Sequence, residues 1–250
     1  MRIAVISDIH GNLDALTAVL KDIDHCAVDH IVCLGDCIGY GAEPEAVVQR
    51  IAALGCPTVL GNHEAAALDP GVLDWFNTAA RRSMELTMRL LSARSLRFIA
   101  GLPETIERWD ARFVHGFPPD SVWRYLFQVS PEEINEWFAV MPERICFVGH
   151  THRLELVGGD GKRIRRTGLP PGPVRLDAAL RYIVNVGSVG QPRDGTPEAK
   201  YVLWEPERDR LESRSVPYPY GSAADKILRA GMPETHALCL LPAAWQEDWS

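Results

Sequence analysis

Short apolar runs alternate with amphipathic stretches through the first quarter of the chain. Three of these runs are of strand length and predict buried strands at residues 2–7, 30–34 and 57–60. Between them, apolar residues recur at helical spacing. This spacing predicts one helix after an N-cap at Asn12 and a second helix from Pro44 to a stop at Gly55. The β-α-β-α-β order predicts a parallel sheet with right-handed crossovers.

The hydrophobic pattern changes after residue 64. Residues 65–100 contain no strand-like run, and their apolar spacing predicts a helical insertion that caps the strand ends. A capping box at 130–133 predicts a further helix. The later strands are predicted at 111–114, 144–148, 154–157, 181–186, 200–204 and 211–216. Residues 222–241 are expected to form a helical tail, and residues 1–250 a single domain.

Composition and charge narrow the class of protein. With 250 residues, 46% of them hydrophobic, the chain supports one large core. The net charge of −7 argues against a dedicated nucleic-acid binder. No apolar run reaches the roughly 18–20 residues of a membrane span, and the first one is too short for a signal peptide. The six cysteines form no CxxC pair, and this predicts a cytoplasmic protein with reduced thiols. A homo-oligomer is compatible with the sequence.

Side chains of the types that bind metal ions follow five of the predicted strands, at the point where each strand ends. Five of the eight histidines lie in these breaks. The candidate ligands are Asp8, His10, Asp36, Asn62, His115, His150 and His152. His63 and Glu64 share the third break with Asn62. Because parallel strands end at one edge of a sheet, we expect these side chains to meet there.

The types of these side chains indicate a catalytic metal site. Carboxylate, amide and imidazole groups without a thiolate favour Mn, Fe, Co, Ni or Zn in a catalytic site over a structural zinc site. Manganese is the first expectation. Seven candidate ligands exceed the need of one ion with an open position, but they fit two divalent ions that share a carboxylate. Two ions roughly 3.5–4 Å apart are the usual arrangement for in-line attack at phosphorus.

The motifs D-x-H, G-D, G-N-H-E, an isolated histidine and G-H-T-H occur in this order between Asp8 and His152. This order resembles the calcineurin-like metallophosphoesterase superfamily. The runs 35–41 and 185–193 resemble its small bacterial branch of YfcE-like phosphoesterases and diadenosine-polyphosphate hydrolase relatives. The resemblance implies an α/β fold, namely a four-layer α/β/β/α sandwich with the site at the strand ends. It also implies hydrolysis of a small phosphorylated substrate: a phosphodiester, nucleotide or dinucleoside polyphosphate.

The resemblance further implies a role for each motif residue. One metal ion would be held by Asp8, His10, Asp36 and His152. The other would be held by Asp36, Asn62, His115 and His150, with Asp36 bridging the ions and a hydroxide between them as nucleophile. His63 would not bind metal but would face the scissile phosphate and stabilise or protonate the leaving oxygen. Glu64 would orient His63 through a hydrogen bond.

Several other segments have two interpretations. Tyr40, Arg193 and Glu64 are candidates for substrate contact, although Arg193 could equally pair with a surface acid. The glycine-rich run after Asn185 either cradles phosphate with its N–H groups or forms a tight turn. The basic segment 162–166 fits a solvated hairpin better than a substrate site. Aromatic residues at 75, 76, 123, 125 and 127 either wall a pocket for a base or belong to the core.

Three other functions compete with a small-molecule phosphoesterase. A protein serine/threonine phosphatase would need an open site, which the predicted cap opposes. A nuclease would need a basic track, for which the acidic balance gives little support. A non-catalytic scaffold on the same fold would lack metal ligands, and all seven candidates are present in this sequence.

Overall fold

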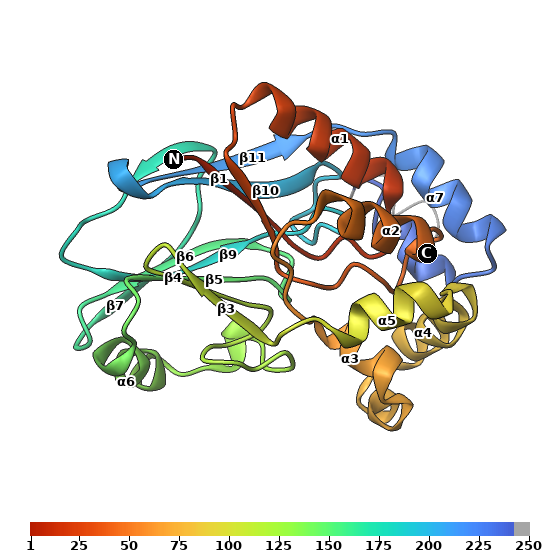
Figure 1. Cartoon of the computed structure of the whole chain (residues 1–250), viewed down its shortest axis with the longest axis horizontal. Coiled ribbons are helices and arrows are strands. Elements are labelled where there is room, and N and C mark those ends of the chain that lie inside the picture. Colours follow the sequence, from red (N-terminus) through yellow and green to blue (C-terminus); the bar gives the residue numbers. More distant parts are fainter. Residues whose placement is uncertain (243–250) are drawn as a thin grey trace.

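The chain folds into two β-sheets enclosed by helices (Figure 1). The computed structural model describes residues 1–242. The first sheet has the order β11-β10-β1-β2, formed by β1 (Ile3–Ile6), β2 (His30–Cys33), β10 (Ala199–Glu205) and β11 (Arg210–Val216). The second has the order β3-β4-β5-β9-β6-β7, formed by β3 (Thr105–Arg108), β4 (Ala111–Val114), β5 (Ile145–Val148), β6 (Leu154–Gly159), β7 (Ile164–Gly168) and β9 (Arg181–Val186). A short strand, β8 (Gly172–Arg175), precedes β9.

The helices fall into three groups. The first covers the first sheet and comprises α1 (Leu13–His25), α2 (Pro44–Leu54), α7 (Tyr220–Arg229) and α8 (Glu234–Leu238). The second, which we call the helical cap, comprises α3 (Asn62–Leu68), the 3-10 helix η1 (Pro70–Trp75), α4 (Thr78–Leu90) and α5 (Ala93–Ala100). The third group covers the second sheet and comprises α6 (Pro131–Val140), preceded by the 3-10 turn η2 (Leu126–Gln128). A last 3-10 turn, η3 (Pro206–Arg208), joins β10 to β11.

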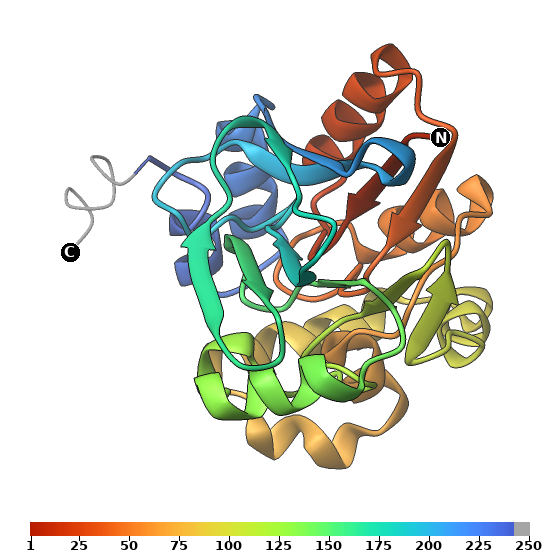
Figure 2. The same cartoon turned by 90° about the vertical axis from the view of Figure 1, so that its left-hand side faces the viewer.

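Three hydrophobic cores separate four layers of structure. Successive residues of β1 point to opposite faces of its sheet. Ile3 and Val5 therefore belong to the core between the sheets, whereas Ala4 and Ile6 pack against α1 and α2. On the far side of the second sheet, α6 contributes to a third core. Figure 2 shows α1 and α6 on opposite outer sides of the paired sheets. The predicted α/β fold class and its four-layer sandwich are confirmed.

The predicted strand at 57–60 is wrong in extent. These residues meet β2 only through an isolated parallel bridge between Cys33 and Thr58. Pro57 has no N–H to donate to a ladder, and Leu60 N turns away to donate to Pro103 O at 2.7 Å. The segment still runs parallel to β2. The loop that follows residue 60 therefore begins at the same end of the first sheet as the loop that follows β2.

The strands that precede the candidate ligands belong to two sheets, not to the single parallel sheet that the opening pattern predicts. β1 is parallel to β2 but antiparallel to β10, whereas β4, β5 and β9 run parallel in the second sheet. The hydrophobic pattern does not predict β3 and β7, because neither strand contains a buried residue. Similarly, β8 contains a glycine and a proline among its four residues.

The helical cap and the C-terminal helices close over the loop that follows β2. Met84 of α4 shares a core with Ile38 of that loop and with Ala237 of α8. His236 Nε2 also lies 3.3 Å from Ala79 O, which joins α8 to α4. Among residues 1–242, no helix is long and apolar enough to cross a membrane. The predicted domain of 1–250 extends into residues 243–250, which lie outside the described part of the chain.

Candidate metal centre

The candidate ligands lie on loops that leave β1, β2, β4 and β5, and Asn62 begins α3. Five of them have left-handed backbone, with φ between 48° and 67°: Asp8, His10, Asp36, His150 and His152. Such conformations are unfavourable for residues other than glycine, by about 1–3 kcal/mol each. They persist where the surrounding structure enforces them, and they concentrate at functional sites. Strained backbone therefore accompanies five of the seven candidate ligands, and half of the non-glycine residues with positive φ among residues 1–242 are these ligands.

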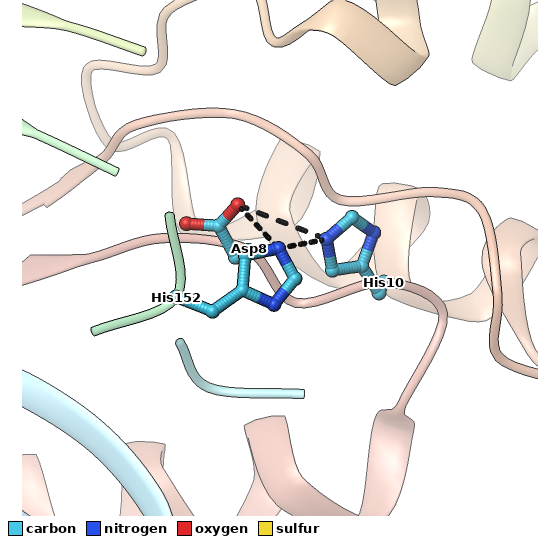
Figure 3. A group of neighbouring side chains, drawn as sticks. All are labelled: Asp8, His10 and His152. Atoms are coloured by element: carbon cyan, nitrogen blue, oxygen red, sulfur yellow. Dashed lines mark hydrogen bonds and ion pairs between the residues drawn. The ribbon is translucent and has the colours of Figure 1, made fainter. Parts of the chain in front are cut away.

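The first group of ligand atoms comes from Asp8, His10 and His152 (Figure 3). His10 Nδ1 donates to Ile38 O at 3.0 Å, and His152 Nδ1 donates to Gln191 O at 2.6 Å, because a carbonyl oxygen can only accept. Each neutral ring then carries a lone pair on Nε2. These two Nε2 atoms face each other at 3.1 Å. Asp8 Oδ1 lies 3.3 Å from His152 Nε2 and is buried without a hydrogen-bond partner.

The second group comes from Asp36, His115 and His150, with Asn62 beside them. His115 Nδ1 donates to Leu34 O at 2.8 Å, and His150 Nε2 donates to Trp123 O at 3.1 Å. In the neutral rings this leaves a lone pair on His115 Nε2 and another on His150 Nδ1, and these two atoms are 3.2 Å apart. Asn62 Oδ1 also lies 3.0 Å from His115 Nε2. A second set of electron-pair donors therefore points at one position.

Asp36 lies between the two groups. Its Oδ1 accepts a hydrogen bond from His63 N at 2.9 Å. Its Oδ2 is 3.3 Å from His115 Nε2 in the second group and 3.7 Å from His10 Nε2 in the first. The same oxygen is therefore within reach of both positions.

The charges at the centre favour a cation. Burial raises the pKa of Asp8 and Asp36, but the surrounding imidazoles outweigh it and bring both pKa values well below the ordinary range. Burial lowers the pKa of His150 to about 3 and that of His152 to about 4. Although burial opposes it, the negative charge of Asp36 raises the pKa of His115 to about 10. A divalent ion beside Asp36 would compete with that proton.

The residues present fit divalent metal ions. Four imidazoles each donate one N–H to a backbone carbonyl and turn the other nitrogen inward, which is the usual support of metal-binding histidines. When the rings are neutral the inward nitrogens are all acceptors, and Asp8 Oδ1 is buried without a hydrogen-bond partner. Acceptors packed at about 3 Å without a shared hydrogen repel one another, and a cation between them removes that cost.

Glu64 has a different role from the expected one. Its carboxylate does not orient the ring of His63 but accepts hydrogen bonds from four backbone N–H groups. Oε2 accepts from Asp36 N at 2.7 Å and Gly61 N at 3.1 Å, and Oε1 accepts from Cys37 N at 2.7 Å and Ile38 N at 3.3 Å. Because Glu64 lies in the first turn of α3, its side chain can reach the loop after β2. It is fully buried and holds the loop of Asp36, so substrate contact is also wrong for this residue.

His63 lies at the edge of the centre. Its Nδ1 is 3.1 Å from the sulfur of Met84, and its Nε2 is 3.9 Å from Asp36 Oδ2. The ring packs edge-on against Tyr40 and Phe76, with centroids 4.6 and 5.1 Å away. His63 Nε2 also groups with His10 and Asp36 at distances that suit a metal ion. Burial lowers the pKa of this imidazole well below its ordinary value.

The glycine-rich run 187–190 is a structural support and not a phosphate cradle. Three of its N–H groups are already used, since Gly187 N donates to Asn185 Oδ1 at 3.2 Å, Val189 N to Ser7 O and Gly190 N to Asp8 O, the last two at 2.9 Å. A Cβ on Gly190 would lie 1.7 Å from Ile9 O, so only glycine allows this approach. Asn185 Nδ2 donates to Gly149 O at 2.7 Å. The run therefore ties the loop after β1 to the loop after β5, a role that the sequence motif alone does not reveal.

Tyr40 and Arg193 both border the centre. The ring of Tyr40 packs on His10 with centroids 4.4 Å apart. Arg193 Nη2 donates to Gln191 Oε1 at 3.2 Å, and within residues 1–242 Arg193 forms no ion pair with an acid. Burial raises the pKa of the phenols of Tyr40 and Tyr125, and the positive charge of Arg193 opposes this rise at both. Arg193 therefore lies close to both hydroxyl groups.

The sequence did not decide whether Tyr125 lines a pocket or belongs to the core, and it predicted no role for Trp123 at the ligands. The ring of Tyr125 stacks on that of His150 with centroids 3.7 Å apart and an angle of 9°. Trp123 O accepts the hydrogen bond that fixes His150. Both residues lie on the segment 116–130. Its aromatic content was the only available signal, since a backbone carbonyl has no sequence signature.

Comparisons with known proteins place this geometry in a family. Residues 1–209 match the model of the calcineurin-like phosphoesterase superfamily domain. The protein MJ0912 of Methanocaldococcus jannaschii is 37% identical over 237 residues, which cover 93% of this chain and 94% of that protein. The crystal structure of a metallophosphoesterase from Sphaerobacter thermophilus is 36% identical, with a TM-score of 0.83 over 96% of this chain and 98% of that one. Protein PH1004 of Pyrococcus horikoshii OT3 is 19% identical, with a TM-score of 0.74 over 96% of this chain and 98% of that one, and it shows the same fold.

Proposed function

The chain belongs to the calcineurin-like phosphoesterase superfamily, and from this premise we propose a small-molecule phosphoesterase that uses two divalent metal ions. Membership makes it a metal-dependent hydrolase of phosphoric esters. The proposed substrate is a phosphodiester, nucleotide or dinucleoside polyphosphate. The proposed ions are two per chain, with manganese first and Fe, Zn, Ni or Co as alternatives. A cytoplasmic location stays a prediction from the cysteine pattern, and a homo-oligomer stays open.

The observation that carries the proposal is the position of Asp36 between two groups of inward-facing electron-pair donors. We assign one ion to Asp8, His10, Asp36 and His152, and the other to Asp36, Asn62, His115 and His150. Asp36 Oδ2 supports the bridging role, because it is 3.7 Å from His10 Nε2 and 3.3 Å from His115 Nε2. A mononuclear site would leave one group of buried acceptors without a cation.

The chain's own residues then position and surround the reacting phosphate. When bound, two ions would activate water for in-line attack at phosphorus and neutralise charge on the phosphoryl oxygens. His63 is proposed to contact the scissile phosphate and stabilise the leaving oxygen rather than bind metal. Its support is that the ring packs against Tyr40 and Phe76, both of which line the cavity next to the centre. Tyr40 and Arg193 are proposed as further substrate contacts.

A small substrate fits better than a protein loop. The cavity beside the centre has a volume of about 410 Å³ and is lined by residues of the helical cap as well as of the centre. That volume lies within the range of roughly 300–1,000 Å³ typical of small-ligand pockets. The residues proposed as ligands are all present, which argues against a non-catalytic scaffold.

The proposal is tested by hydrolysis of bis-p-nitrophenyl phosphate with added Mn²⁺. Asp36→Asn should lower kcat/KM by at least about 100-fold, because even a residue behind a metal ligand is typically worth 10–100-fold. Asp24→Asn, an exposed position on α1, is the control and should keep the wild-type rate. Equal rates in wild type and Asp36→Asn would overturn the proposal. Phosphomonoesters, cyclic nucleotides and dinucleoside polyphosphates, each with several metals, would then identify the substrate.

A further inference from the structure

The cavity next to the metal centre, which we call the aromatic cavity, has walls that the proposed chemistry does not require. It lies between the helical cap and the segment 116–130, and two proposed ligands, Asn62 and His150, line it. Its other lining residues are Tyr40, Trp75, Phe76, Asn77, Ala80, Trp123, Tyr125 and Gln128. A group bound there would be continuous with a phosphate at the metal centre.

Two indoles face this cavity from opposite elements. Trp75 ends η1 and is 82% exposed, whereas Trp123 belongs to the segment 116–130. Their ring centroids are 6.5 Å apart at an angle of 45°. Phe76 meets Trp123 edge-on at 6.3 Å and fixes one wall. An indole that remains in water contributes little to folding, and together with Trp123 and Phe76 the exposed Trp75 forms an aromatic wall that a planar ligand can contact.

Two amide side chains that line the aromatic cavity, Asn77 and Gln128, offer NH2 donors. Asn77 Oδ1 accepts from Ala80 N at 2.9 Å, and Gln128 Oε1 accepts from Tyr125 N at 3.1 Å. Each carbonyl oxygen therefore already accepts one hydrogen bond, whereas each amide NH2 group has no partner among residues 1–242. A planar ligand that matched these walls would carry acceptor atoms on its edge. Nucleobases have such edges, with carbonyl oxygens and unprotonated ring nitrogens, whereas simple aryl or alkyl groups do not.

We propose that the aromatic cavity binds the nucleobase of a phosphate ester, with the base stacked on Trp75, its rim packed against Trp123 and its acceptor edge toward Asn77 and Gln128. The inference rests on the proposed function and narrows its substrate class to esters that carry a nucleoside. Stacking on aromatic side chains is largely independent of which base is present. The cavity therefore selects a nucleoside arm over an alkyl arm, with the donor amides favouring acceptor-rich bases.

The kinetic test compares two diesters with the same p-nitrophenolate leaving group, thymidine 5′-(p-nitrophenyl phosphate) and methyl p-nitrophenyl phosphate. Wild type should prefer the thymidine ester, and Trp75→Ala should lower that preference by about 5-fold to 100-fold, the usual effect of removing one stacking ring. Trp75 is exposed, so its removal leaves the fold intact. Leu90→Ala is the control, since it removes a 47% exposed apolar side chain from the same cap outside the cavity. A preference that is unchanged in Trp75→Ala and Trp123→Ala would overturn the inference and leave the proposed function standing.

A binding measurement separates failure of the cavity from failure of catalysis. GMP and ribose 5-phosphate, which differ only by the base, are titrated into the metal-free protein and followed by calorimetry. GMP should bind at least 5-fold more tightly than ribose 5-phosphate, and Trp75→Ala should remove that difference. Equal affinities in wild type would contradict the inference. If the affinities differ as expected but neither diester is hydrolysed above the Asp36→Asn rate, the proposed function fails and the nucleobase site stands.

Discussion

Replacing Glu64 with glutamine tests whether this buried carboxylate holds the loop that carries Asp36. The substitution keeps the size of the side chain but exchanges one acceptor oxygen for an NH2 group. Each oxygen of Glu64 accepts two backbone N–H groups, so either orientation of the amide leaves two buried donors facing another donor. A buried donor without a partner costs about 1–3 kcal/mol. The free energy of unfolding should therefore fall by about 2–6 kcal/mol.

The assay is urea unfolding of the metal-free protein, followed by circular dichroism. Glu133→Gln is the matched control: it removes the same charge from an ion pair with Arg124 on the surface, where solvent screens the interaction. Its effect should be small beside that of Glu64→Gln. If both variants unfold at the urea midpoint of wild type, the hydrogen bonds of Glu64 do not hold the loop and the reasoning is refuted.

Three further predictions follow from single contacts. Gly39→Ala should lower kcat/KM by at least about 10-fold, because a Cβ there would lie 2.1 Å from His63 Nδ1. Gly55→Ala carries similar backbone strain at φ 61° with open space around it and should keep full activity. His63→Gln should lower kcat while leaving two bound metal ions per chain, and loss of an ion would instead make His63 a ligand. Although burial opposes it, the backbone N–H of Ser92 lowers the pKa of Glu45 to about 2 from 4.5, so the ionised form stabilises the fold above about pH 4.5. This stabilisation should be lost as the pH falls toward 2, and the thermal midpoint of Glu45→Gln should depend less on pH over that range.

The sequence predicted the convergence of the candidate ligands because it follows from chain order. Asp8, Asp36, His115 and His150 each follow a strand, and strands that run in the same direction end together. The pattern did not predict that these strands belong to two sheets. Strand pairing depends on β10, which joins the first sheet antiparallel to β1 although it lies nearly 200 residues away. No local pattern records such a pairing.

The role of Glu64 and the support for the histidines could not be predicted, for two physical reasons. Glu64 binds backbone N–H groups, and any residue other than proline at positions 36–38 provides them. The carbonyls that orient His10 and His152 are likewise backbone atoms, on loops 28 and 39 residues away. By contrast, the N-caps at Asn12 and Ser130 follow from local chemistry and were predicted.

The two-ion centre is tested most directly by adding Mn²⁺ stepwise to chelator-stripped protein while recording hydrolysis of bis-p-nitrophenyl phosphate. The protein concentration is kept well above the dissociation constants, so that each added ion is bound. If Asp36 bridges two ions, the rate should rise to a plateau at two Mn²⁺ per chain. A plateau at one ion per chain would contradict the account, and so would a hydrolysis rate that never exceeds the rate measured without protein.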